Sequence, residues 1–549
     1  MTDDAVPVPE ATAELPPDPD VAAGEVEHLG DASDPGGRLQ EHLLDRLLYK
    51  GVLPRYAFPT DVATFYVFDK VNSSSYRAEF IYSPSQGLPV ALSQYAPGKD
   101  VFIGGSRYRS GAIYSPFKGD MKYAWDRKRL YYECSTCEHG ATHSYRAEAR
   151  GDELDCPRCS ATASFGPAKT WIRPPGFAHP VCWDEETSPT DQPPPSRPSR
   201  AKLSTSSPSE GMKWRAVSDR LSVVGDRQML LVTNSGPRRE GYLYCTGCGR
   251  IEPMVGVAHS LLDAHAKPFP DDKDPQCPGF TARKVVLGVD FMTDILLLAM
   301  RVEPPVRLTP ENLATRIALR TACEALVRST TTVLELEPGE LEADFRAVPA
   351  NDGTRGLGAE IYLYDTLPGG AGLARQAADR IEEILDSALN LLEGCDCDTS
   401  CYQCLRGFRN KYDHDRLDRL LGAGLLRHIL RGELPHLDGV RREDATRVLA
   451  LDLRRQLGDA YRVDEDVQLD VPGIGSVLVP ILIQDQAMGR PTVVCVAHPL
   501  TPGIPPDDAL TEMAEFSATE VRVVSELLVR RALPHTTSQI LKSFDPPGI

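Results

Sequence analysis

Cysteine pairs at metal-ligand spacing constrain the fold of this sequence more than any other feature. Fourteen cysteines occur in 549 residues, and eleven of them fall into three close groups. Because a C-x-x-C pair aims two thiolates at one point, two such pairs can complete the tetrahedral ligand set that zinc prefers. Disulfides are the weaker interpretation, since paired cysteines in a reducing compartment more often bind metal. The chain is therefore predicted to fold around structural zinc sites.

The first group contains two C-x-x-C pairs, formed by Cys134 with Cys137 and by Cys156 with Cys159. Four thiolates fill the coordination sphere of zinc and leave no open position for a substrate or a reactive water. A structural zinc ribbon is expected here.

The second group has only three cysteines, Cys245, Cys248 and Cys277, so a histidine is needed as the fourth ligand. Two histidines are available, His265 and His259. We favour His265 because it lies in a polar, proline-bounded segment, whereas His259 follows a more apolar one. The alternative is that only the C-x-x-C pair binds metal.

The third group places Cys395, Cys397, Cys401 and Cys404 within ten positions. So dense a group of thiols indicates a metal, and zinc is favoured. An iron-sulfur cluster also takes four thiolates and stays open as an alternative, and with it a redox-sensing role. Together the three groups predict about three zinc ions per chain.

Length, charge and residue pattern predict a mixed α/β mosaic with several zinc-ribbon-like modules. A chain this long exceeds the size at which one hydrophobic core stops growing. The start is acidic and proline-rich rather than signal-like, and no apolar run is long enough to span a membrane, so we expect a cytoplasmic protein. The predicted regions are a disordered acidic tail (1–36), a β-rich region (37–130), a four-cysteine ribbon (131–184), a flexible linker (185–211), a domain with two metal sites (212–440) and an α/β module (441–549).

Periodicity predicts the main elements of the last two regions. Buried strands are expected at 284–291 and 294–303, a helix at 310–328 opening at Pro310, and a long helix at 373–392. The final module resembles restriction-nuclease-like folds in its strands, but apolar residues occupy the positions that would hold magnesium, so it is expected to be inactive.

The net charge of −18 means that any contact with DNA must be local, because affinity for nucleic acid depends on Lys and Arg displacing counterions. One segment mixes basic with aromatic residues in the manner of a single-strand stacking platform. Its candidate contacts are Arg107, Arg109, Lys122, Arg127, Lys128 and Arg129. The alternative is a strand-rich segment with a solvated basic edge.

Searches for catalytic motifs find no phosphate-binding loop with its lysine, so ATP hydrolysis by the usual route is not expected. The glycine-rich turn at 365–372 is interpreted as a strand-to-helix turn, with anion binding as the alternative. His265, Lys267 and Asp272 match the phospholipase D spacing once, without its continuation. The rival function is a metal-dependent nuclease that uses the core carboxylates Asp290, Asp294, Glu360 and Asp365.

Four segments resemble the MrfA-like zinc-binding domain that follows the motor in some bacterial helicases. They are GVLPRYAFP at 51, LGVDFMTDILLL at 287, YDTLPGGAG at 364 and CDCDTSCYQCLRGFRNKYDHDRLDR at 395. The last is the most specific, and its four cysteines match the ligands of that domain. In its stand-alone form the chain resembles the DrmB family of the DISARM anti-phage system over residues 40 to 440.

This resemblance implies a partner and a role. DrmB-like proteins are thought to assemble with a separate DrmA-like helicase subunit to engage foreign DNA. The function expected from the resemblance is a non-catalytic, zinc-binding helicase partner that reaches DNA through the complex and does not contact membranes.

Overall fold

The structure is a computed structural model that describes residues 61–544, except 75, 118, 184–198, 205–212, 256–259, 272, 350–355, 486–490, 518 and 543. The predicted acidic tail, most of the predicted linker, His259 and Asp272 therefore lie outside the described residues. Within them the molecule is a mixed α/β protein with three cysteine clusters, as the sequence predicted. No helix of this described part is both long and apolar enough to cross a membrane.

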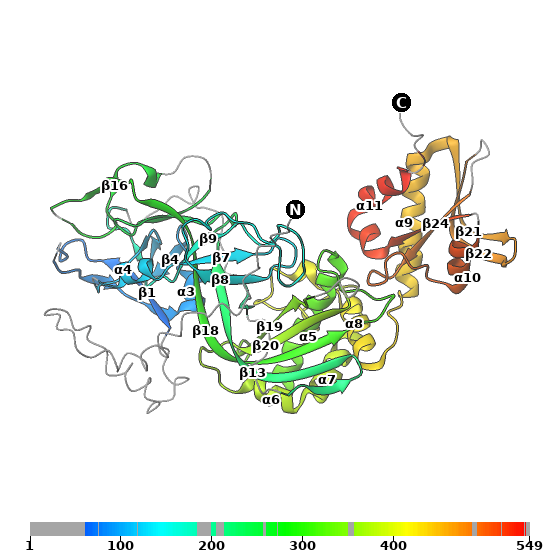
Figure 1. Cartoon of the computed structure of the whole chain (residues 1–549), viewed down its shortest axis with the longest axis horizontal. Coiled ribbons are helices and arrows are strands. Elements are labelled where there is room, and N and C mark those ends of the chain that lie inside the picture. Colours follow the sequence, from blue (N-terminus) through cyan, green and yellow to red (C-terminus); the bar gives the residue numbers. More distant parts are fainter. Residues whose placement is uncertain are drawn as a thin grey trace, which may run out of the picture.

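Two long antiparallel strands run through the centre of the molecule (Figure 1). They are β13 (Leu221–Asn234) and β18 (Ala282–Arg301), paired from Leu221 opposite Met300 to Asn234 opposite Leu287. The sequence predicted two strands where β18 is continuous. The gap between the two predicted strands, at 292–293, is instead part of the strand, and the Thr293 hydroxyl donates to the carbonyl oxygen of Asp365.

Each half of β18 carries a different set of neighbours in one eleven-stranded sheet. Its carboxyl half pairs with β20 (Gly358–Asp365), which pairs with β19 (Leu341–Ala347). Its amino half pairs with β14 (Tyr242–Cys245) and β9 (Lys169–Ile172). Shorter members are β12 (Arg215–Ser218) and β15 (Ile251–Pro253).

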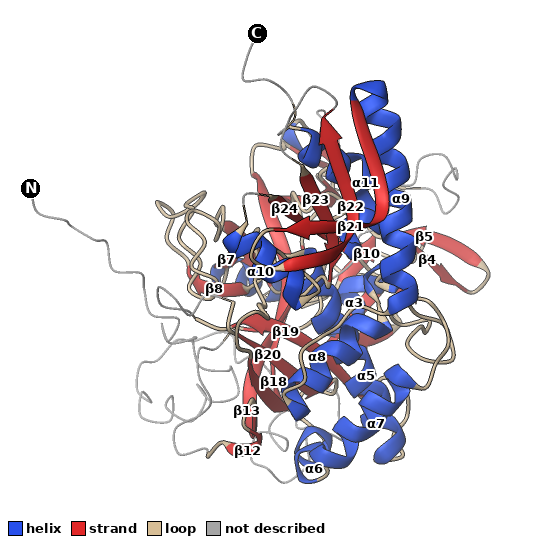
Figure 2. Ribbon diagram, turned by 90° about the vertical axis from the view of Figure 1, so that its right-hand side faces the viewer, coloured by secondary structure: helices blue, strands red, loops and turns tan. Residues whose placement is uncertain are grey.

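Helices cover one face of the carboxyl half of this sheet (Figure 2). They are α5 (Leu313–Val333), α6 (Leu373–Asp379), α7 (Ile381–Glu393) and α8 (Arg419–Arg431). Helix α5 begins after Asn312, whose side chain accepts the Ala314 amide, and not at Pro310 as predicted. The predicted helix 373–392 is divided at Arg380 into α6 and α7.

The amino half of β18 packs against a second sheet, and Phe65, Phe177 and Leu287 share its core. In this sheet β1 (Val62–Phe68) pairs with β2 (Phe80–Tyr82), β3 (Ser85–Gly87) and β10 (Phe177–His179), and β10 pairs with β6 (Ala112–Ile113). Nearby elements are α3 (Leu88–Gln94), α4 (Asp120–Asp126) and the hairpin β4 (Asp100–Ile103) with β5 (Ser106–Arg109).

Non-local strand pairing crosses two of the boundaries expected from the sequence. Strand β10 belongs to the predicted ribbon, yet it lies parallel to β1. Residues 199–204 belong to the predicted flexible linker, yet Lys202 and Leu203 form β11, which is buried against β13. This part of the linker prediction is wrong. The residues around Lys202 and Leu203 are mostly polar, so composition gives no sign that these two residues form an edge strand of the sheet.

The first cysteine group lies on a small ribbon with its own core. Strand β7 (Arg129–Glu133) pairs with β8 (Gly140–Ser144) and with β9, so the ribbon is continuous with the central sheet. The second group lies beside β14 and the pair β16 (His265–Ala266) and β17 (Gln276–Cys277).

The last part of the chain forms a separate layer at one end of the molecule, on the right in Figure 1. Helix α9 (Gly439–Leu457) and the helix α11 (Glu526–Leu541) pack on a four-stranded sheet through Leu449, Ile481 and Val529. The sheet order is β21 (Tyr461–Val471), β22 (Gly475–Asp485), β23 (Thr492–Ala497) and β24 (Glu520–Ser525), and α10 (Asp508–Phe516) lies on its other face.

Candidate metal centres

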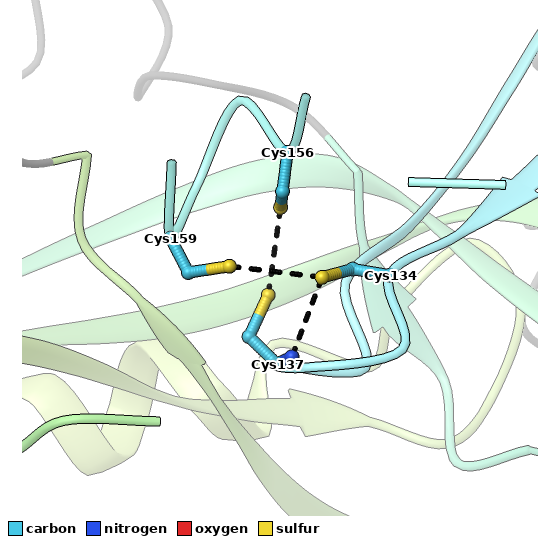
Figure 3. A group of neighbouring side chains, drawn as sticks. All are labelled: Cys134, Cys137, Cys156 and Cys159. Carbon is cyan, nitrogen blue, oxygen red and sulfur yellow. Dashed lines mark hydrogen bonds between the residues drawn. The ribbon is translucent and has the colours of Figure 1, made fainter. Parts of the chain in front are cut away.

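The first site gathers Cys134, Cys137, Cys156 and Cys159 from two turns that face each other (Figure 3). The Sγ atoms of Cys134 and Cys159 lie 3.6 Å apart, as do those of Cys137 and Cys156. A disulfide would require about 2.05 Å, so these are four separate thiols. A zinc ion with four Zn–S bonds of about 2.3 Å would set its sulfur atoms about 3.8 Å apart, which these distances match closely.

Backbone amides around the first site favour thiolates. Cys134 Sγ accepts the amides of Thr136 and Cys137, and Cys156 Sγ accepts the amide of Arg158. Hydrogen bonds from the neighbouring thiols, first from Cys137, lower the pKa of Cys134. Because a metal ligand must be deprotonated, this environment suits a cation at the centre.

The second site gathers Cys245, Cys248, Cys277 and His265, all of them buried. Cys248 Sγ lies 3.3 Å from Nε2 of His265, and Cys245 Sγ lies 3.5 Å from Cys277 Sγ. The other ring nitrogen, Nδ1, is 2.8 Å from the carbonyl oxygen of Asp263, so it can donate there and leave Nε2 for a metal. Hydrogen bonding, chiefly from Cys248, lowers the pKa of Cys245 to about 4.

The third site gathers Cys395, Cys397, Cys401 and Cys404 between α7 and α8. Its sulfur separations are 3.6 Å for Cys395 with Cys401 and 3.7 Å for Cys397 with Cys404. The backbone amide of Cys404 is the main cause that lowers the pKa of Cys401 to about 6. All four sulfur atoms lie within 4.8 Å of one another, which suits one tetrahedral ion better than a larger iron-sulfur cluster.

The structure thus brings together all eleven cysteines that the spacing singled out, with His265 as the twelfth ligand. Sequence reasoning missed the residues that support them. Thr281 Oγ1 lies 3.3 Å from Cys245 Sγ, and Ser164 Oγ lies 3.2 Å from Cys134 Sγ. Only the fold shows these hydroxyls, since neither belongs to a recognisable motif.

The predicted nucleic-acid residues are not one free basic surface. Arg129 is only 8% exposed, pairs with Asp290 at 2.7 Å and lies over the Trp171 ring. Arg107 and Arg109 both pair with Asp100. The prediction for Arg129 is wrong, because a buried guanidinium held by a carboxylate cannot also contact a phosphate.

The remaining three predicted contacts stay near the surface. Arg127 lies over the Tyr123 ring, and Lys128 lies between the rings of Trp125 and Tyr145. Lys122 is exposed on α4.

The core carboxylates do not form a nuclease centre among the described residues, where the three cysteine groups are the clusters able to hold a metal. Asp290 is paired with Arg129, and Glu360 with Arg346. Asp365 accepts the amides of Ala371, Leu373 and Ala374, and Asp294 accepts the amide of Gly372. In the glycine-rich turn the amides of Ala371 and Gly372 therefore donate to carboxylates, and those of Gly369 and Gly370 donate to backbone carbonyl oxygens, so the alternative of anion binding there is wrong.

The phospholipase D interpretation has no support in the described part of its motif. Lys267 Nζ lies 2.9 Å from Asp271 and 3.0 Å from Asp274, and His265 faces the second metal site.

Fold and sites together define a class of protein, a mixed α/β chain with three closed cysteine-rich sites whose donors fit zinc. Comparison with known proteins agrees with this class. Residues 322–405 match the family model described as the MrfA Zn-binding domain, a range that runs from α5 to the residue after Cys404. The chain thus contains a zinc-binding domain related to that of MrfA.

One curated relative aligns with most of this chain. It is the Druantia protein DruE of Escherichia coli (strain UMEA 4076-1), 32% identical over 431 residues that cover 74% of this chain and 23% of DruE. The chain spans about a quarter of the length of this relative.

Two solved structures of the DUF1998 helicase MrfA were also matched. The structure bound to DNA has a TM-score of 0.32 at 11% identity and covers 66% of this chain and 33% of that chain. The structure of MrfA alone has a TM-score of 0.28 at 12% identity and covers 72% and 39%.

Proposed function

We propose that this chain is a zinc-stabilised, non-catalytic partner of a helicase that acts in anti-phage defence in the cytoplasm. In the finer form of the proposal it is DrmB-like and assembles with a separate DrmA-like helicase to engage foreign DNA. The observation that carries the proposal is the match of residues 322–405 to the MrfA Zn-binding domain, which includes the third site. The homology to DruE over 431 residues supports the same role.

Zinc has a structural task in this proposal. Each site offers four protein ligands, so a tetrahedral ion would have no open position for catalysis. Each site also joins segments that are distant in sequence or poor in apolar residues. The metal would then stabilise the surfaces that a helicase partner contacts, and the motor activity would belong to that partner.

Co-purification tests the proposal. The full chain, tagged and zinc-loaded, is co-expressed with a helicase encoded beside it, and the complex is assayed for strand unwinding and ATP hydrolysis. We expect a stable complex that contains about three zinc ions per copy of this chain and that engages DNA more tightly than the helicase alone. A chain that stays solitary in this experiment, or that cleaves DNA unaided in the presence of Mg²⁺ or Mn²⁺, would overturn the proposal.

A further inference from the structure

A large cleft lies between the first and third cysteine sites. Its volume is ≈ 1160 Å³, and Cys137 of the first site lines it on one side. The opposite wall is the segment 405–416, which begins directly after Cys404, and α5 and β19 complete the cleft. Neither the sequence motifs nor the proposed partner role assigns a ligand to this cleft.

Ion pairs hold the walls of the cleft in fixed positions. Arg200 Nη2 lies 2.9 Å from Glu324 on α5 and 2.7 Å from Asp413 on the opposite wall. Asn410 Nδ2 donates to Glu324 as well, at 2.8 Å. The segment after the third site is therefore attached to α5, and the cleft is a built feature of the fold.

The cleft is basic in an acidic protein. Nine Arg and Lys side chains line it against six Asp and Glu, whereas the whole chain carries a net charge of −18. Such a local reversal of charge favours an anionic ligand, because the surrounding surface repels anions and the cleft concentrates them.

Five of the arginines that line the cleft have no ion pair with a carboxylate among the described residues. Arg328 donates only to the carbonyl oxygen of Tyr402, and Arg406 to the hydroxyl of Ser400. The five are Arg239, Arg328, Arg406, Arg409 and Arg416. Guanidinium groups that lack a carboxylate partner can bind phosphates without first breaking an ion pair.

Aromatic side chains accompany these arginines on the wall after the third site. Tyr412 lines the cleft and is 51% exposed, and Phe408, next to Arg409, is 80% exposed. Lys411 Nζ lies over both rings, 4.1 Å from the Phe408 centroid and 4.9 Å from the Tyr412 centroid. Exposed aromatic rings beside a cation are suited to unstacked bases, which present a flat face that a base pair inside a duplex does not.

One residue that lines the cleft is a buried histidine, His139, with an unused ring nitrogen. His139 is 5% exposed, and its Nε2 has no hydrogen-bond partner in the described structure. A buried polar atom without a partner is costly, and a ligand that reaches this nitrogen would satisfy it.

We propose that this cleft binds a segment of single-stranded nucleic acid, with phosphates on the unpaired arginines and bases against Tyr412 and Phe408. The proposal deepens the proposed function, on which it rests for its biological meaning. It assigns the binding of single-stranded nucleic acid to the cleft of this chain and not to the basic segment around α4.

Fluorescence anisotropy with a labelled oligothymidylate of about 20 nucleotides tests the cleft in the isolated, zinc-loaded full chain. The variant R239Q/R409Q/R416Q removes three cleft charges. The matched control K122Q/R127Q/R455Q removes three exposed charges elsewhere, two of them from the face that the sequence favoured. Zinc content and thermal unfolding of both variants are compared with the parent chain to verify the fold.

The cleft variant is expected to bind at least about tenfold more weakly, with a log–log salt slope shallower by about two, as the loss of three phosphate contacts predicts. The control is expected to stay within about twofold of the parent chain. The double variant F408A/Y412A should weaken strand binding about fivefold or more and leave binding of heparin unchanged.

Three results would overturn the inference: equal loss in the cleft variant and the control, tighter binding of a duplex than of the single strand, or no binding at low salt. Each can be told apart from failure of the proposed function, since co-purification with a helicase needs no nucleic acid. If the chain binds the helicase but not the single strand, only the proposal of nucleic-acid binding in the cleft is refuted.

Discussion

At the residue scale, the cysteine sites show how short-range spacing determines local geometry. In the third site the amide of Cys401 donates to Cys404 Sγ at 3.2 Å, within a turn of only four residues. Such a turn aims both sulfur atoms at one point wherever it occurs, so its ligands can be recognised without knowledge of the fold. This is why all twelve candidate ligands could be named from the sequence and are brought together in the structure.

Replacing Cys401 with Ser should remove one of about three zinc ions and loosen the segment between α7 and α8, because the metal substitutes there for apolar core. Metal analysis of the purified variant and its susceptibility to proteolysis near residue 400 measure both effects. The control is Cys182→Ser, since Cys182 is exposed and belongs to none of the three sites. Unchanged zinc content in the Cys401 variant would contradict the assignment.

The nucleic-acid residues could not be predicted in the same way. The sequence around Arg129 is typical of an exposed basic segment. Its ion-pair partner Asp290 lies 161 positions away, so no local pattern indicates that the guanidinium is paired. The same holds for the glycine-rich turn, whose amides are taken in part by Asp294 from the distant strand β18. Spacing reveals which groups can bind, and only the fold reveals which of them are already bound within the chain.

At the element scale, one buried carboxylate joins the C-terminal layer to the rest of the molecule. Asp418 is 0% exposed and caps α8 by accepting the amides of Leu420 and Leu421. Its carboxylate also forms ion pairs with Arg441 of α9, at 3.1 Å from Nη1, and with Arg530 of α11, at 2.7 Å from Nη2. A single residue thus fixes the start of one helix and the attachment of two others.

Asp418→Ala should destabilise this junction by about 3 kcal/mol, because it removes the cap of α8 and one of the two carboxylates that Arg441 and Arg530 each contact, leaving them Asp398 and Glu526. Urea unfolding should show the C-terminal layer separating as an earlier transition. Asp444→Ala serves as the control, since Asp444 pairs with Arg447 on the solvent-exposed side of α9 and should cost less than about 1 kcal/mol. Equal effects of the two changes would show that the junction does not depend on Asp418.

The same junction should respond to acid through His498. Burial lowers the pKa of His498 to about 4 in the folded protein, against 6.5 for the free side chain. Between pH 4 and pH 6.5 the imidazole is therefore protonated in the unfolded chain and neutral in the folded chain. Stability is full above pH 6.5 and falls as the pH drops from 6.5 towards 4. Two and a half pKa units correspond to about 3 kcal/mol.

The variant His498→Asn tests this prediction. Its amide oxygen can accept the Leu500 amide that Nδ1 of His498 now accepts, without titrating. Denaturant unfolding at pH 7 and pH 5 should show a smaller loss of stability in the variant than in the parent chain. The other buried histidines are common to both proteins and cancel in this comparison. An identical pH dependence would remove His498 as the cause.

Elements were predicted well where their periodicity is local and less well where tertiary contacts decide. The helix predicted at 373–392 agrees within one residue at its outer ends with α6 and α7, although it is divided at Arg380. The gap predicted at 292–293, inside β18, contains the polar residue Thr293, which is buried and donates its hydroxyl to the carbonyl oxygen of Asp365. The parallel pairing of β1 with β10 has no signal in either strand.

At the scale of the whole molecule, the metal sites and the cleft should depend on one another. The first site holds Cys137 on one side of the cleft, and the third site anchors the wall that carries Arg409 and Tyr412. Domain boundaries drawn from composition separated these two sites, because composition contains no information about which distant surfaces face each other.

Removal of zinc by a strong chelator should therefore abolish strand binding before it unfolds the central sheet, which has its own apolar core. Anisotropy and far-ultraviolet circular dichroism followed together during chelation measure the order of events. Zn²⁺ should restore binding and Mg²⁺ should not, since thiolates bind Mg²⁺ poorly. Full strand binding by the metal-free chain would contradict the dependence.

The continuous strand β18 connects the two halves of the molecule. Twenty residues of extended chain span about 66 Å, far more than an ordinary strand, and its two halves serve two separate cores. Strand β13 pairs with β18 along its whole length of fourteen residues, so a hydrogen-bonded ladder and not a flexible linker joins the two cores. We therefore expect the two cores to move as one body when the chain binds a partner.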